Sequence, residues 1–110
     1  MNQGKQFREA VAQNELLQCL GTTTAYHALL AEKSGAKALY VSGGGVAAGS
    51  LGVPDLGIST LNDVAVDVER ICSRTSLPVL VDIDTGWGGS FNIARAINTL
   101  EKAGAAAIHI

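Results

Sequence analysis

Apolar residues occur along the chain in two alternating patterns, short continuous runs and positions at helical spacing. The continuous runs, which are typical of buried strands, are residues 16–20, 38–41, 79–83 and 106–110. The helical spacing predicts helices over residues 5–13, 25–34, 61–71 and 90–104. Regular alternation of this kind is typical of an α/β protein with a parallel sheet and right-handed crossovers.

Residue types at the predicted helix ends support these boundaries. Thr60 and Asp63 have the spacing of a capping box, which satisfies free backbone N–H groups at the start of a helix. Ser90 is a candidate N-cap for the last helix. Gly35 and Gly104 each follow a predicted helix, where glycine can adopt the left-handed conformation that ends it.

A glycine-rich segment, residues 42–59, follows the second predicted strand, and we expect a long loop there. Six of the 13 glycines lie between residues 43 and 57, and three more follow the third strand. Parallel α/β folds bind ligands at the carboxyl ends of their strands. The backbone N–H groups of Ser42-Gly43-Gly44-Gly45 are candidates for an anion-binding nest that holds a carboxylate, with the Ser42 hydroxyl as a further donor. The alternative is a flexible loop; neither a Walker motif nor a GxGxxG fingerprint is present.

Two carboxylates, Asp82 and Asp84, lie at the end of the third predicted strand. Residues two apart on a strand share one face, with Cα atoms roughly 7 Å apart. Carboxylates so placed repel each other unless a cation lies between them, and Mg²⁺ binds one or two protein carboxylates plus water and substrate oxygens. The alternative for Asp84 is a turn cap, whereas a charge at Asp82, inside an apolar run, is costly without a partner. Asp55 is equally suited to forming a turn and to a functional role.

Three further side chains have open or structural interpretations. His27 lies in the first crossover helix and is expected to be structural. His109 lies near the end of the fourth strand, where it is free to point into a barrel. Trp87 lies between glycines, where it either shields a site or packs on a neighbouring helix.

Composition narrows the class of protein. Hydrophobic residues make up 47% of the chain, aromatic residues only 5%, and the net charge is −2. No basic cluster indicates a nucleic-acid surface, no apolar run reaches the ~20 residues of a membrane helix, and we see no signal peptide. Cys19 and Cys72 fit no CxxC or zinc spacing, so we interpret them as reduced structural thiols of a cytoplasmic protein.

The chain length of 110 residues bears on the fold. A (β/α)8 barrel needs ~250 residues, so four strands are about half of one. We therefore expect residues 1–110 to be the N-terminal portion of a single barrel domain, truncated after the fourth strand; the alternative is a complete small α/β domain. Residues 32–41 and 101–110 are also alike, with five of ten positions identical at an offset of 69, which we interpret as a recurring helix-to-strand turn.

Two segments resemble a known enzyme family. Tyr40-Val-Ser-Gly-Gly-Gly45 with the sequence that follows to Thr60, and Leu80-Val-Asp-Ile-Asp-Thr-Gly-Trp-Gly88, resemble 2-methylisocitrate lyase, of the isocitrate lyase and phosphoenolpyruvate mutase superfamily. The first motif is specific within the superfamily, whereas the paired aspartates are shared more widely. The resemblance extends over nearly the whole chain from Phe7.

The resemblance implies a modified α/β barrel that cleaves 2-methylisocitrate to pyruvate and succinate in propionate breakdown through the methylcitrate cycle. It implies Mg²⁺, with Mn²⁺ as a substitute, and a homotetramer. By motif, the substrate-binding residues are Tyr40, Ser42, Gly43, Gly44, Asp55 and Asp82, and the metal residues are Asp82 and Asp84.

The family's catalytic Cys-Gly-His loop lies beyond the fourth strand and is not in this sequence, so we expect no catalytic residue in residues 1–110 and no lyase activity from them alone. Two alternatives stay open. One is another superfamily reaction, such as that of a phosphonomutase, phosphonopyruvate hydrolase or oxaloacetate decarboxylase. The other is a non-catalytic fragment.

Overall fold

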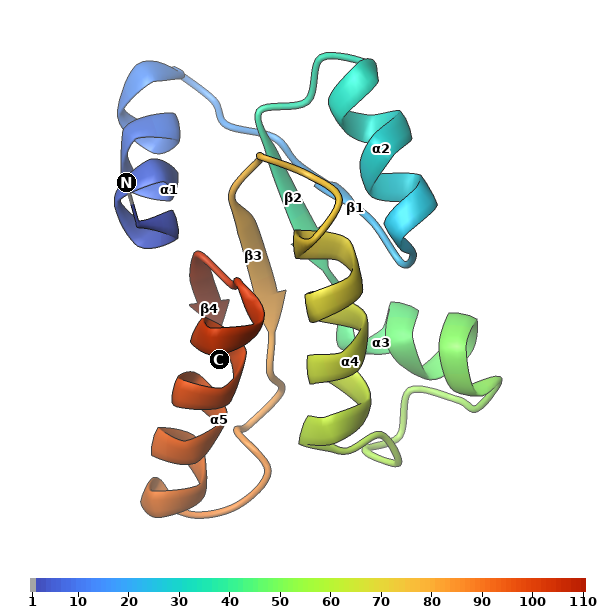
Figure 1. Ribbon diagram of the computed structural model, residues 1–110. Coiled ribbons are helices and arrows are strands. Elements are labelled where there is room, and N and C mark those ends of the chain that lie inside the picture. The colour runs from blue at the N-terminus through green and yellow to red at the C-terminus, as the bar shows by residue number, and fades with distance from the viewer. Residues whose placement is uncertain (1) are drawn as a thin grey trace.

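The computed structural model describes residues 2–110. Its elements follow the predicted order, with an additional helical segment after the second strand (Figure 1). They are α1 (Gln3–Gln13), β1 (Cys19–Gly21), α2 (Ala25–Lys33), β2 (Ala38–Val41), α3 (Gly43–Gly45), the π-helix η1 (Val46–Leu51), α4 (Leu61–Cys72), β3 (Val79–Asp82), α5 (Ser90–Ala103) and β4 (Ala107–His109).

The four strands form one parallel sheet in the order β1-β2-β3-β4, which confirms the predicted α/β class. Tyr40 pairs with Leu80 across β2 and β3, and Asp82 pairs with His109 across β3 and β4. The carboxyl ends of the strands therefore lie along one edge of the sheet, below the arrowhead of β3 in Figure 1.

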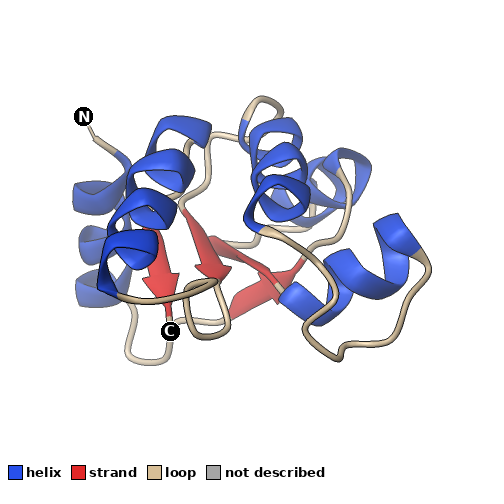
Figure 2. Ribbon diagram, turned by 90° about the horizontal axis from the view of Figure 1, so that it is seen from below, coloured by secondary structure: helices blue, strands red, loops and turns tan. Residues whose placement is uncertain are grey.

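The two faces of the sheet have different surroundings. Alternate strand residues such as Leu39, Val79 and Val81 are buried against the helices, because successive side chains of a strand point to opposite faces. Tyr40 and Asp82 lie on the other face and are only partly buried. Figure 2 shows helices above the strands and only loops beneath them, so the candidate side chains project from the face without helices.

The predicted long loop at residues 42–59 is wrong over its first half, where α3 and η1 form a continuous helical segment. Ser42 begins this segment as an N-cap, because its Oγ accepts a hydrogen bond from the Gly45 N–H at 3.2 Å. Glycine is a poor helix former, but Gly45 is required by close packing: a Cβ there would lie 2.7 Å from Thr23 Cγ2. Helical periodicity could not reveal a segment whose glycines are selected by contacts.

The predicted helix ends are confirmed at α4 and corrected at α5. Thr60 and Asp63 form the expected capping box, and Gly104 follows α5 with φ +110°. Ser90 is the first helical residue and not the cap; Gly89 takes that position and makes no side-chain hydrogen bond. The glycine-rich turn after β3 ends at Gly89, whose backbone is extended, so α5 begins one residue earlier than expected.

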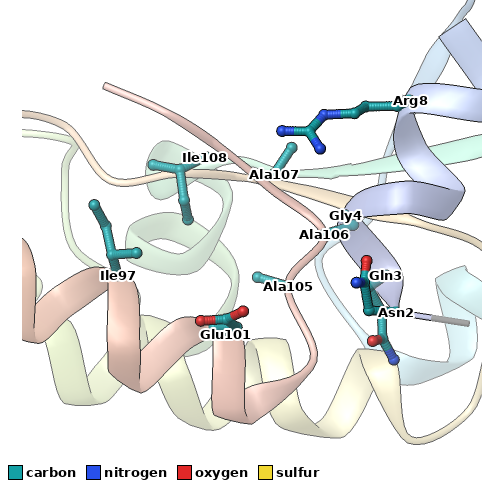
Figure 3. Close-up of a pocket in the computed structure, with 10 residues that line it drawn as sticks. All are labelled: Asn2, Gln3, Gly4, Arg8, Ile97, Glu101, Ala105, Ala106, Ala107 and Ile108. Atoms are coloured by element: carbon teal, nitrogen blue, oxygen red, sulfur yellow. The ribbon is translucent and has the colours of Figure 1, made fainter.

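A cleft of about 340 Å³ lies between α1, α5 and the start of β4 (Figure 3). Arg8 and Glu101 are its charged lining residues. The cleft is at the amino-terminal side of β4, away from the aspartates that the sequence singles out. No helix of the described residues is both long and apolar enough to cross a membrane.

Candidate active site

Asp82 connects the carboxyl ends of β2 and β3. Its Oδ2 accepts a hydrogen bond from the Gly43 N–H at 3.1 Å, and its Oδ1 accepts one from the Asp84 N–H at 3.0 Å. Hydrogen bonds to a charged acceptor are stronger than neutral ones. One half-buried carboxylate therefore fixes both the start of α3 and the turn after β3.

Asp84 does not share a strand face with Asp82, so that part of the sequence prediction is wrong. The strand ends at Asp82, and Asp84 has a left-handed backbone with φ +50°. Asp tolerates this conformation better than most residues, and the bond from its N–H to Asp82 holds the turn. The two carboxylates still meet, because both approach Gly43.

Asp55 joins these two acids from the far end of the helical segment. A Cβ on Gly43 would lie 3.1 Å from Asp82 Oδ2 and 3.5 Å from Asp84 Oδ1, and a Cβ on Gly44 would lie 3.0 Å from Asp55 Oδ2. A side chain at either position would press against one of these carboxylates. Three acids thus surround two consecutive glycines.

The electrostatics of this cluster are unfavourable without a cation. Burial raises the pKa of the Asp84 carboxyl above its ordinary value, and the negative charges of Asp82 and Asp55 raise it further. The one ion pair among the described residues, Arg70 with Asp67, lies elsewhere. The acids therefore repel one another without a basic side chain to compensate.

This donor set fits a hard divalent cation. Carboxylate oxygens are the ligands that Mg²⁺ prefers, and one or two of them suffice because water and substrate complete its coordination. Over residues 2–110 no three His, Cys, Asp or Glu side chains are arranged to hold a metal on their own. Asp82 and Asp84 are thus suited to a partly hydrated ion and not to a closed protein cage.

The predicted anion nest is replaced by a helix start. A nest needs alternating right- and left-handed backbone conformations, whereas Gly43, Gly44 and Gly45 form α3 and none of them has a positive φ. The Gly43 N–H is bonded to Asp82 and the Gly45 N–H to Ser42. The Ser42 hydroxyl still has its proton to donate, and the Gly44 N–H lies between the two bonded groups.

Tyr40 lies on the same face of the sheet and reaches across β3. Its phenol oxygen is 3.1 Å from Nδ1 of His109 on β4. Burial raises the pKa of the Tyr40 phenol, and the charges of Asp82 and Asp84 raise it further. The phenol therefore keeps its proton at neutral pH beside the acidic cluster.

The sequence did not reveal the contacts that anchor the site's loops. Ser50 of η1 donates to Oδ2 of Asp67, which is 6% exposed, at 2.5 Å and so attaches the helical segment to α4. The Trp87 indole N–H donates to the Ser59 carbonyl at 3.2 Å, which joins the loop after β3 to the loop before α4. The sequence did contain one sign of the first contact, because Asp67 is a charged residue on the otherwise apolar face of α4.

The other residues considered from sequence lie outside the cluster. His27 is bonded through Nδ1 to the Thr23 hydroxyl at 2.9 Å, which fits the structural interpretation. Cys19 and Cys72 are both free thiols. Burial raises the pKa of the Cys72 thiol to about 11, so this thiol stays protonated and is a poor nucleophile.

Replacing Asp84 by Asn is expected to stabilise the metal-free protein at neutral pH. At pH values between the Asp84 pKa of the unfolded chain and its raised pKa in the folded chain, the folded chain binds more protons than the unfolded chain. The free energy of unfolding therefore falls as the pH rises through that range. An Asn at position 84 does not ionise, so it removes this loss of stability, and it also tolerates the positive φ of the position. Urea unfolding in EDTA over about pH 4 to 7 measures both chains; the same downward slope in the Asn variant would contradict the assignment.

Residues 7–110 match the family model for phosphoenolpyruvate phosphomutase. The chain belongs to this family. It is also 59% identical over 107 residues to the 2-methylisocitrate lyase of Shewanella oneidensis. That match includes 97% of this chain but only 37% of the relative, so residues 1–110 span little more than a third of its length.

Solved structures of the family superpose closely on the chain. A 2,3-dimethylmalate lyase of the PEP mutase/isocitrate lyase superfamily matches with a TM-score of 0.88 and 36% identity, over 100% of this chain and 39% of that one. A phosphonopyruvate hydrolase in complex with oxalate and Mg²⁺ matches with a TM-score of 0.84 and 30% identity, over 98% and 38%. These neighbours are TIM-barrel enzymes, which confirms the predicted fold class.

Proposed function

We propose that the protein containing this chain is a Mg²⁺-dependent carbon–carbon lyase that cleaves 2-methylisocitrate to pyruvate and succinate. The observation that carries this proposal is the convergence of Asp55, Asp82 and Asp84 on Gly43 and Gly44 without a basic partner. Relatives named 2-methylisocitrate lyase, at 57–59% identity over this chain, support the choice of reaction.

The acidic cluster explains why a divalent cation belongs to the proposal. A tricarboxylic substrate cannot approach three carboxylates unless positive charge lies between them. Asp82 and Asp84 would hold Mg²⁺ directly or through water. Bound there, the ion would supply charge stabilisation for the substrate oxygen that becomes negative as the carbon–carbon bond breaks.

The protein's own groups would bind and orient the substrate. The Ser42 hydroxyl and the Gly44 N–H are the donors placed to hold one carboxylate, at the start of a helix where a negative charge is favoured. Gly43 allows the Asp82 and Asp84 carboxylates to lie close to the backbone at the start of the helical segment. Tyr40 would donate to the substrate from the face without helices, and Asp55 lies beside Gly44.

The remaining chemistry is assigned to the rest of the barrel. Because residues 1–110 correspond to 37% of the Shewanella oneidensis relative, we expect activity from a full-length protein and none from this segment alone. We also expect a cytoplasmic homotetramer that works in propionate breakdown, as the sequence resemblance implies.

The test uses a chimera in which residues 1–110 replace the matching segment of the Shewanella oneidensis enzyme, with which they are 59% identical. We expect the chimera with Mg²⁺ to release pyruvate from 2-methylisocitrate, and EDTA to abolish the release. Phosphonopyruvate serves as the competing substrate, since a phosphonopyruvate hydrolase shares this fold. A folded chimera that turns over only phosphonopyruvate would refute the proposal.

A further inference from the structure

Tyr40 and His109 form a hydrogen-bonded pair that spans the central strand of the candidate site. Tyr40 is opposite Leu80 in the register, whereas His109 is opposite Asp82, two residues further along β3. The phenol must therefore lean toward the carboxyl end of the sheet to reach Nδ1 at 3.1 Å. The two rings are tilted, with centroids 6.2 Å apart, so the contact is made through their polar atoms and not by stacking.

The direction of this hydrogen bond determines what Tyr40 can do. If the phenol O–H donates to Nδ1, its proton is occupied and the phenol oxygen can only accept. If Nδ1–H donates to the phenol oxygen, the O–H proton is free to point elsewhere. A neutral imidazole exists as either tautomer, and the hydrogen bonds of its nitrogens decide which is present.

The nearby acids favour the second arrangement. Burial raises the pKa of the Tyr40 phenol, and the charges of Asp82 and Asp84 raise it further. Their negative charge attracts the O–H proton toward the carboxyl edge. A neutral nitrogen lone pair attracts that proton less than an anionic oxygen does. The phenol oxygen then needs a donor on its other side, and His109 is the residue placed to supply it.

We propose that His109 is a positioning residue for Tyr40: its Nδ1–H donates to the phenol oxygen and directs the phenol O–H toward the carboxyl edge of the sheet. There the O–H would donate to an oxygen of the anionic substrate. This role rests on the proposed function for its substrate, but the geometry of the pair does not depend on it.

Two substitutions separate this role from simple packing. Asn at position 109 places an amide nitrogen near the position of Nδ1, whereas Gln places its amide further out, near Nε2. In the chimera we expect His109→Asn to keep kcat within about threefold and His109→Gln to lower kcat about tenfold, the effect of one neutral hydrogen bond, with a smaller change in KM. Equal losses in both variants would overturn the proposal.

A double-variant cycle tests whether His109 acts through Tyr40. Because the phenol oxygen is absent from Tyr40→Phe, we expect His109→Gln to cause no further loss of kcat in that background. A full additional tenfold loss would show that His109 acts independently, and would also overturn the proposal.

Solid-state ¹⁵N spectroscopy of histidine-labelled chimera supplies a readout that needs no activity. We expect the His109 signal, identified by its loss in His109→Asn, to show a protonated Nδ1 and an unprotonated Nε2, and Tyr40→Phe to change that pattern. The opposite tautomer, or no response to Tyr40→Phe, would refute the pairing. A chimera that does not cleave 2-methylisocitrate but shows the expected tautomer would refute the proposed reaction and leave the pairing supported.

Discussion

Replacing Asp82 by Asn is expected to lower 2-methylisocitrate turnover by the chimera on the order of 100- to 1,000-fold, the range found when a group that stabilises transition-state charge is removed. Asp82 accepts the N–H groups of Gly43 and Asp84, one on each oxygen. An amide offers one oxygen only, so its NH₂ group would face a backbone N–H, and the negative charge that attracts Mg²⁺ would be lost. The same substitution therefore weakens Mg²⁺ binding and disturbs the two hydrogen bonds that hold the start of α3 and the turn after β3.

Isothermal titration of the chimera with Mg²⁺, with and without pyruvate, measures the binding part of this effect. We expect the Asp82→Asn variant to bind Mg²⁺ much more weakly, and Glu69→Gln, an exposed carboxylate on α4, to bind normally. Unchanged Mg²⁺ affinity in the Asp82 variant would exclude this residue from the metal site.

Replacing Gly86 by Ala is expected to destabilise the protein by about 2–4 kcal/mol, from a strained backbone combined with overpacking. Gly86 has φ +89°, and a Cβ there would overlap Cγ1 of Ile93 on α5. The Gly86 N–H also donates to the Ile83 carbonyl at 2.8 Å, which closes the turn that presents Asp84. Relief of the overlap would therefore displace either α5 or an acid of the site.

Gly57→Ala is the matched control, because Gly57 has φ +73° but no atom lies within 4 Å of an added Cβ. Gly57→Ala should lower the free energy of unfolding only by the backbone strain, about 1–2 kcal/mol. Urea unfolding of the chimera compares the two variants, and a Gly86→Ala/Ile93→Ala double variant should lose less than the sum of the single changes. Equal costs for Gly86→Ala and Gly57→Ala would show that the contact with Ile93 is unimportant.

The sequence by itself determined the order of the elements and the parallel sheet. Apolar periodicity and residue types at helix ends are local properties, so they identified β2 at residues 38–41 and the Thr60–Asp63 capping box without knowledge of the fold. Asp82 could also be found, because a charge inside an apolar run is costly unless something compensates it. The functional assignment of these residues stays a prediction until the Asp82 variant is measured.

Only the tertiary structure decided how the site residues meet. Asp55 lies 27 positions before Asp82, and the helical segment between residues 43 and 51 brings it beside Gly44; that segment escaped prediction because contacts, and not propensity, select its glycines. Asp84 left the strand because a bond to Asp82 stabilises a turn there.

Tyr40 and His109 show the same division between local and tertiary information. They occupy equivalent positions in the two similar segments at an offset of 69, which the sequence displays but does not explain. The sheet places those segments on either side of β3, staggered by two residues, so that a phenol can reach an imidazole across it. Periodicity along a chain determines which face a side chain occupies, whereas the register between strands determines which side chain it meets.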